Sequence, residues 1–242
     1  FSMDENNKRI KKHCSKGGIA ALFENGYVTI MKGTWKIRVE KVTDIPITFG
    51  GKAMHNVMNT LPSILACYLF RNIKVEDIRQ ALHTFIPSVS QTPGRLNLFE
   101  FKNFKFLADF AHNPAGLTLL CDFVNRLDST RKIGIISGTG DRRDDDIREI
   151  GRISAKNFDE IIIRQDKHLR GRTAEEMINL LVEGINEAKT HDIPLKILHK
   201  ESAAIQYAYD YVTPGSIITI ILYVIPDALN QLTKLQTAEK KS

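Results

Sequence analysis

The stretch Phe104-Lys-Phe-Leu-Ala-Asp-Phe-Ala-His-Asn-Pro114 joins a strand-like apolar run to a polar loop and the start of a helix. Proline suits the first turn of a helix, where free N–H groups attract anions. The loop before it carries an acid, a histidine and an amide, namely Asp109, His112 and Asn113. Open α/β sheets place their ligand loops where strands end and helices begin. The stretch therefore predicts an α/β domain with a ligand loop, with the alternative that Asp109 or Asn113 only caps the helix.

The same arrangement returns at Gly138-Thr-Gly-Asp-Arg-Arg-Asp144, after the apolar run 132–137. The glycines let the backbone approach a ligand, and Arg142 and Arg143 supply bidentate donors for phosphate or carboxylate. A third such loop, residues 165–172, brings Arg170 and Arg172. The alternatives are a self-neutralising charged turn for the second loop and an exposed basic turn for the third. No loop has the spacing of a metal site or of a nucleophile triad.

Outward from these loops, strands and helices alternate. Strands are expected at 96–101, 104–110, 132–137, 160–164, 195–198 and 216–222, and helices at 114–127, 145–157, 173–189, 201–211 and 226–235. Such alternation predicts a Rossmann-like, mostly parallel sheet with flanking helices.

The N-terminal part has a different pattern. Residues 19–40 alternate β-prone runs with turns, and Asn25-Gly26 indicates a hairpin. Helices are expected at 54–70, with Pro62 kinking or interrupting the first, and at 76–85. Residues 87–94 have the composition of a linker, so we divide the chain into domains 1–93 and 94–242.

Composition excludes several classes. The net charge of +6 is modest, and the basic clusters at Lys8-Arg9 and Lys11-Lys12 are read as solvated rather than as a nucleic-acid site. The longest apolar run, 217–225, is too short to span a membrane. Three cysteines without a CxxC motif indicate a reducing, cytoplasmic environment. Neither a P-loop nor a GxGxxG motif is present, which argues against a dehydrogenase.

Three further side chains are candidates for nucleotide binding. Asn56 and Asn59 lie one helical turn apart, so both can reach one planar base, the alternative being a helix cap plus a solvent-facing amide. Arg95 follows Pro93-Gly94 at the expected junction of the domains, where a cleft ligand is expected.

Taken in order, these motifs resemble the Mur ligase superfamily and most closely the C-terminal half of its cyanophycin synthetase group. The resemblance rests on Phe1-Ser-Met, on residues 49–59, 93–97 and 109–115, on Gly138-Thr-Gly-Asp-Arg-Arg-Asp-Asp145 and on Arg170-Gly-Arg172. It implies the end of a central ATPase domain with β-hairpins and helices, followed by the C-terminal Rossmann-like domain. It also implies an ATP-dependent amide ligase that works through an acyl phosphate and joins arginine to the β-carboxyl of aspartate in a poly-aspartate chain.

The resemblance also assigns roles and partners. Asn56, Asn59, Arg95 and Asp109 would bind ATP. His112 and Asn113 would line the reaction centre, and Arg142, Arg143, Arg170 and Arg172 would bind substrate. The P-loop and the Mg²⁺ ligands would lie upstream of Phe1, so the 242-residue chain alone is expected not to turn over ATP. The parent protein is expected to form a homo-oligomer and to bind neither nucleic acid nor membrane. The alternatives are a muramyl-peptide or folylpolyglutamate ligase, or a non-catalytic module that binds nucleotide or polymer.

Overall fold

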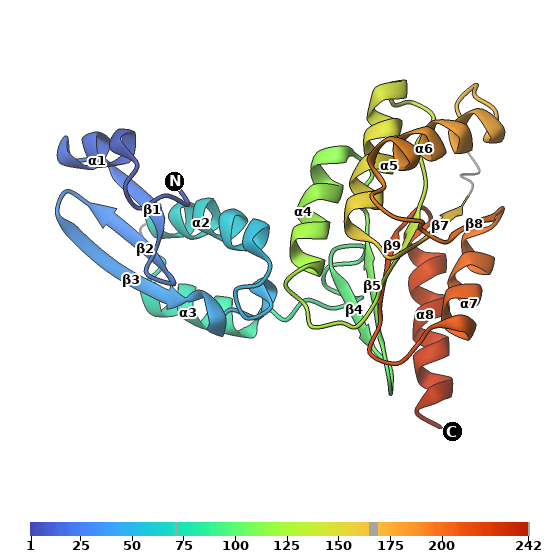
Figure 1. The fold of residues 1–242 in the computed structure, drawn as a ribbon. Helices are drawn as coiled ribbons and strands as arrows, with labels where there is room; N and C mark the ends of the chain where they lie inside the picture. Colours follow the sequence, from blue (N-terminus) through green and yellow to red (C-terminus); the bar gives the residue numbers. More distant parts are fainter. Residues whose placement is uncertain (71, 165–168, 242) are drawn as a thin grey trace. The chain divides into compact units, whose positions relative to one another are not determined.

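A computed structural model of the chain describes residues 1–70, 72–164 and 169–241 (Figure 1). The chain folds into two compact units, Phe1–Pro87 and Ser88–Ser242. The domain boundary that the sequence predicts, between residues 93 and 94, lies a few residues C-terminal to the boundary between Pro87 and Ser88 in the structure.

The first unit packs helices against an antiparallel sheet. Its elements are α1 (Lys8–Ser15), β1 (Ile19–Glu24), β2 (Tyr27–Lys32), β3 (Trp35–Lys41), α2 (Met54–Leu69) and α3 (Val75–Thr84), with 3-10 turns at Val42–Asp44 and Pro46–Thr48. The strands pair in the order β1-β2-β3. Asn25 and Gly26 have φ values of 51° and 80°, as a primed hairpin turn requires, so the predicted hairpin is confirmed.

The helices of this unit differ from the prediction in two places. Pro62 does not interrupt α2, because the apolar face of that helix, with Val57, Leu61 and Ile64, is buried in the core of the unit. That burial outweighs the one backbone hydrogen bond that a proline removes. Helix α1 was also missed, because only Ile10 and Cys14 give it an apolar side. It is held by the Asn7 side chain, which accepts from two backbone N–H groups.

The second unit is built on a six-stranded sheet in the order β4-β5-β9-β6-β7-β8. The strands are β4 (Asn97–Glu100), β5 (Lys105–Asp109), β6 (Lys132–Ile136), β7 (Glu160–Arg164), β8 (Leu195–Leu198) and β9 (Ile217–Ile221). The helices are α4 (Pro114–Val124), α5 (Asp144–Asn157), α6 (Ala174–Ala188), α7 (Glu201–Tyr211) and α8 (Ile225–Glu239). Only β4 is antiparallel to its neighbour. The predicted mostly parallel sheet with flanking helices is therefore confirmed.

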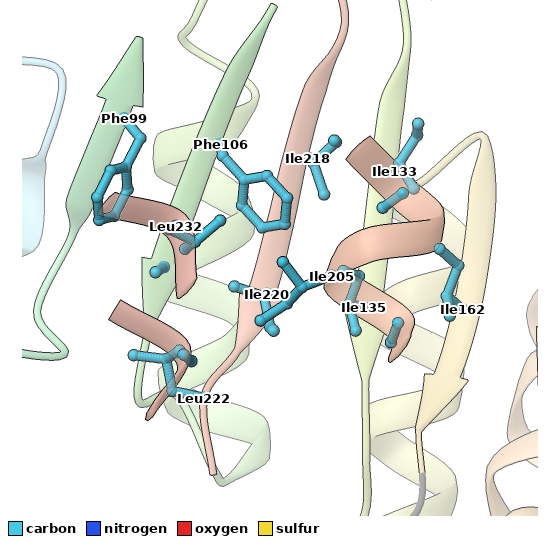
Figure 2. Close-up of a cluster of buried hydrophobic side chains, with 14 of the residues drawn as sticks. Phe99, Phe106, Ile133, Ile135, Ile162, Ile205, Ile218, Ile220, Leu222 and Leu232 are labelled. Atoms are coloured by element: carbon cyan, nitrogen blue, oxygen red, sulfur yellow. The ribbon is translucent and has the colours of Figure 1, made fainter. Parts of the chain in front are cut away.

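One face of this sheet packs against α7 and α8. Figure 2 shows the cluster, in which Phe106, Ile135 and Ile220 from three strands meet Ile205 of α7 and Leu232 of α8. The chain runs from β5 through β6 and β7 to β8 and then returns through α7 to β9. Because crossovers between parallel strands are right-handed, this reversal puts α7 on the face opposite to α5 and α6.

The reversal creates a switch point in the sheet. Strand β9 lies between β5 and β6, so the carboxyl ends of β5, β9, β6 and β7 are consecutive along one edge. The helices that follow β9 and its neighbours leave toward different faces, which opens a crevice where open α/β sheets bind ligands.

Candidate functional site

A cavity of about 430 Å³ lies at this edge of the sheet. Its lining comes from the ends of four adjacent strands and the loops that follow them: Phe110, His112, Ser137, Thr139, Gly140, Asp141, Arg142, Arg164, Arg170, Ile221, Leu222 and Tyr223. Three residues that the sequence predicted as site residues, His112, Arg142 and Arg170, meet here. The cavity has the position that the sequence analysis expected for a ligand site.

The charges of the lining favour an anion. Three arginines face one acid, Asp141, whose Oδ2 accepts from Arg170 Nη1 at 2.7 Å. Arg142 Nε and Thr139 Oγ1 are buried and have no hydrogen-bond partner among the residues that the structure describes. A buried polar atom without a partner costs about 1–3 kcal/mol, more when it is charged. A bound anion would satisfy both atoms.

The most buried charge of this site is a residue that the sequence patterns do not predict. Arg164 ends β7 and is 2% exposed. Its Nη2 donates to the Ile221 carbonyl at 2.8 Å, and its Nε lies 3.0 Å from Glu201 Oε2. Glu201 also accepts from Tyr223 N at 2.9 Å, so the pair ties the end of β7 to the end of β9. A signal was present, since an arginine closes the otherwise apolar run Ile161-Ile-Ile163 just as Asp109 closes β5.

The Gly138–Asp144 loop is held in place by Arg172. The guanidinium donates to the Gly140 and Arg142 carbonyls and pairs with Asp144 and Glu176 at 2.7 Å each. A Cβ at Gly140 would lie 2.1 Å from the Leu169 carbonyl oxygen, so this glycine serves the contact between two loops. These contacts make Arg172 a residue that positions the loop, because its donors are occupied within the protein.

Two other predicted residues make local structural contacts. Arg143 is exposed and forms a bidentate pair with Asp146 at 3.0 and 3.1 Å, which matches the self-neutralising turn weighed as an alternative. Asn113 is the N-cap of α4, and its Oδ1 accepts from Gly116 N at 2.8 Å. Only the Asn113 amide nitrogen is left for a substrate.

His112 is held in one tautomer. Its Nδ1 lies 3.1 Å from the Phe110 carbonyl oxygen, which can only accept, so Nδ1 carries a proton and Nε2 of the neutral ring has a lone pair. The ring packs on Phe110 with centroids 4.6 Å apart, and the Arg95 guanidinium lies 5.8 Å from that phenyl centroid. Phe110 thus contacts both the His112 ring of its own loop and the Arg95 guanidinium of the segment before β4.

Asp109 is 9% exposed, and its Oδ2 accepts from Leu96 N at 2.8 Å. Leu96 has a φ of 45°, so the carboxylate stabilises a strained turn next to Arg95. Burial raises the pKa of Asp109 from 3.8 to about 6, although the Leu96 bond and the Arg95 charge both lower it. The folded chain therefore binds this proton more tightly than the unfolded chain does.

This raised pKa predicts a pH dependence of stability. Between about pH 4 and pH 6 the native state binds more protons than the unfolded state does. The contribution of Asp109 to the free energy of unfolding therefore falls as the pH rises through this window and is constant above it. Asp109→Asn keeps an oxygen for Leu96 N and removes the charge, so we expect the free energy of unfolding to rise by about 2–3 kcal/mol near pH 8 and to be unchanged below pH 4. Urea unfolding of both proteins across this range measures the difference. The same pH profile in both would contradict it.

Asn56 and Asn59 lie in the first unit, where both line a largely apolar pocket of about 440 Å³ between α2 and α3. Asn56 Nδ2 donates to the Ile47 carbonyl at 2.8 Å. Asn59 is exposed. The two amides therefore share a face, and Asn59 is the one directed to solvent.

Other expectations concern metals, membranes and the third loop. The described parts of the chain contain no group of three or more His, Cys, Asp or Glu side chains arranged for a metal ion. No described helix has the length and apolar character needed to cross a bilayer. Residues 165–168 of the third loop lie outside the described residues.

Comparison with known sequences relates this chain to peptide-type ligases. Cyanophycin synthetases of Nostoc sp. and Synechocystis sp. are 38% and 39% identical to it over 97% and 99% of its length. The chain spans only 25% and 27% of those two proteins. A UDP-N-acetylmuramoyl-L-alanyl-D-glutamate–2,6-diaminopimelate ligase of Alkaliphilus oremlandii is 29% identical over 69% of the chain, which spans 33% of that ligase.

Solved structures share the fold. E. coli FolC in complex with ADP superposes with a TM-score of 0.60 at 15% identity, over 93% of this chain and 48% of that one. A pseudomurein peptide ligase type C from Methanothermus fervidus gives a TM-score of 0.60 at 16% identity, over 90% and 42% of the two chains.

The family model described as Mur ligase, glutamate ligase domain, matches residues 94–221. This match confirms the resemblance that the motifs indicated. The matched region covers more than half of the residues of the chain. The chain therefore belongs to the Mur ligase family.

Proposed function

We propose that this chain is part of an ATP-dependent amide ligase of the cyanophycin synthetase type that is located in the cytoplasm. We further propose that the cavity lined by His112, Thr139 and Arg142, which we call the strand-end cavity, binds the incoming amino acid, arginine, by its α-carboxylate. The observation that carries this proposal is the pair of buried, unpartnered donors at Thr139 Oγ1 and Arg142 Nε in a cavity with excess positive charge. A carboxylate accepts from two such donors. The relatives support the ligase class and the polymer substrate.

The proposed chemistry has two steps. The β-carboxylate of an aspartate on the polymer attacks the γ-phosphate of ATP, so that an acyl phosphate forms and ADP leaves. The arginine amine then attacks the acyl carbon, phosphate leaves and the amine loses a proton. Such chemistry needs fixed positive charge and positioning more than a protein nucleophile. Mg²⁺, when bound, would neutralise phosphate charge; the described residues include no group of three or more His, Cys, Asp or Glu side chains arranged to hold it.

The chain's own residues then have distinct tasks. Arg142 and Thr139 hold the arginine carboxylate, and Arg170 adds charge at the rim. His112 Nε2 has the lone pair that can take the proton from the amine. Asn113 supports this loop as the cap of α4. Arg172 positions the Gly138–Asp144 loop, and Arg143 stabilises the start of α5 through Asp146.

For ATP we assign four residues. Asn56 and Asn59 are proposed to contact the adenine, since a base can lie against an apolar pocket and bond to amides. Arg95, which is exposed, is proposed for phosphate, and Asp109 for the ribose hydroxyls. The raised pKa of Asp109 means that its anionic form, the better acceptor, dominates only above about pH 6.

The test compares two adjacent arginines. We expect Arg142→Gln to weaken binding of L-arginine to the 242-residue chain by about 10- to 100-fold, because a bond between two charged groups is lost. Arg143→Gln, the matched control, should change the affinity by less than about threefold, since that side chain is exposed and held by Asp146. Isothermal titration calorimetry measures both.

A panel of amino acids tests the substrate separately. If glutamate or diaminopimelate binds more tightly than arginine, the substrate assignment fails and another ligase of the family is indicated. If Arg142→Gln and Arg143→Gln weaken binding equally, the cavity is not the carboxylate site. If the chain binds none of these amino acids, the amino-acid role of the cavity is lost.

A further inference from the structure

The strand-end cavity has a single acid beside its arginines. Among the described residues that line it, Asp141 is the only carboxylate, whereas Arg142, Arg164 and Arg170 are cations. With the α-carboxylate of the substrate bound at Thr139 and Arg142, the substrate guanidinium at the other end still needs an acceptor. A carboxylate is the group whose geometry and charge suit a guanidinium best. Asp141 therefore has the chemistry to bind the substrate side chain.

The polar groups of the cavity differ in their exposure. Arg142 Nε and Thr139 Oγ1 are buried, whereas Asp141 is exposed and lies at the rim. The apolar side chains of Phe110 and Leu222 also line the cavity. A ligand with its carboxylate on the buried donors can thus lay an aliphatic stem against apolar wall and present a charged end at the rim.

Asp141 already binds a guanidinium in the structure, that of Arg170. Arg170 Nη1 donates to Asp141 Oδ2 at 2.7 Å, and both residues line the cavity. The two side chains are 62% and 44% exposed, so solvent screens the pair and it contributes little to stability. A ligand that carries its own guanidinium can therefore replace this internal partner at small cost.

The two loops do not depend on this pair. Arg172 donates to the Gly140 and Arg142 carbonyls and pairs with Asp144, and its side chain is only 20% exposed. These contacts keep the loops together when Arg170 leaves Asp141. Arg170 itself has a φ of 47°, in the left-handed region that side chains other than glycine rarely adopt. Strained residues of this kind gather at binding sites, where the strain serves function rather than stability.

We propose that Asp141 gives the strand-end cavity its preference for a cationic amino acid, and that Arg170 holds the place of the substrate guanidinium until substrate binds. That the cation is arginine rests on the proposed function. On binding, one guanidinium replaces another on the same carboxylate, and no covalent bond changes. The exchange releases Arg170, whose charge is then available at the rim. A neutral side chain of the same shape cannot make this exchange.

The test compares L-arginine with L-citrulline, whose side chain has nearly the same shape but no charge. Both ligands have the same α-carboxylate and amine, so the ratio of their affinities reports on the side-chain end alone. Calorimetry with the 242-residue chain should show arginine binding about tenfold more tightly, because a bond between two charged groups is stronger. Asp141→Asn should reduce this ratio to less than about twofold.

Two further variants complete the design. Asp145→Asn is the matched control, because Asp145 is an exposed acid of the same segment that pairs with Arg148 and is not among the residues lining the cavity. It should leave the ratio within about twofold of its original value. Arg170→Gln removes the internal guanidinium that arginine must replace, so the ratio should rise by about two- to fivefold.

The outcomes separate this inference from the proposed function. Equal affinities for arginine and citrulline would overturn the role of Asp141 and leave the carboxylate site in place. An unchanged ratio in Asp141→Asn would overturn it as well, and so would a lower ratio in Arg170→Gln, which would mean that Arg170 only positions Asp141. If neither ligand binds, the proposed use of the cavity fails and the role of Asp141 fails with it.

Discussion

Arg164→Met is expected to lower the free energy of unfolding of the second unit by about 3–5 kcal/mol. The methionine fills a similar volume but leaves the Ile221 carbonyl without its donor and the Glu201 carboxylate without its cation. Both groups lie in a place that water hardly reaches, since the arginine side chain is 1% exposed and that of Glu201 13%. Loss of one partner of a buried pair leaves an uncompensated charge, which costs more than the pair contributed.

The unfolding experiment can separate the two units. Trp35 reports on the first unit by fluorescence, whereas circular dichroism follows the helices of both. Arg164→Met should shift the part of the dichroism transition that fluorescence does not follow. Arg131→Met, which breaks the more exposed Arg131–Glu160 pair, is the control and should cost less than about 1 kcal/mol. Equal effects of the two variants would contradict a special role for burial.

The pair can also be tested by a second substitution. Adding Glu201→Gln to Arg164→Met removes the charge left behind, so the double variant should regain about 1–2 kcal/mol. Glutamine keeps an oxygen that can accept from Tyr223 N, so a double variant less stable than Arg164→Met alone would contradict this account of the residual charge.

Gly184→Ala is expected to lower the free energy of unfolding of the second unit by about 2–3 kcal/mol. A Cβ there would lie 2.0 Å from the Arg148 carbonyl oxygen of α5. Across the same contact, a Cβ at Gly151 would lie 2.3 Å from the Leu181 carbonyl oxygen of α6. The two helices thus meet backbone to backbone at a pair of glycines, and neither side has a flexible side chain that can yield.

The control is the same substitution at a roomy site. Gly116→Ala in the first turn of α4 places its Cβ at least 3.4 Å from the nearest atom, an ordinary contact. Alanine also favours the helix, so this variant should gain about 0.5–1 kcal/mol. Urea unfolding followed by circular dichroism measures both variants. A loss at position 116, or no loss at position 184, would contradict the assignment of the close contact.

Much of the fold could be predicted because its causes are local. The alternation of apolar strands with amphipathic helices sets which segments are strands and which are helices, and Asn25-Gly26 sets a turn. Helix α1 and the continuity of α2 through Pro62 escaped prediction, because both depend on burial against a sheet. Local rules count the lost hydrogen bond of a proline but not the packing that offsets it.

The amino-acid sequence by itself determined the fold class, the family and which loops carry charged side chains. The tertiary structure decided what each charge does. Arg142 and Arg143 are adjacent and chemically identical, yet one enters the cavity with a buried donor and the other bonds to Asp146 in solvent. Arg164 became part of the site only because β9 inserts between β5 and β6 and brings the ends of distant segments together. Burial and partner choice depend on residues far apart in the chain, and no local pattern contains them.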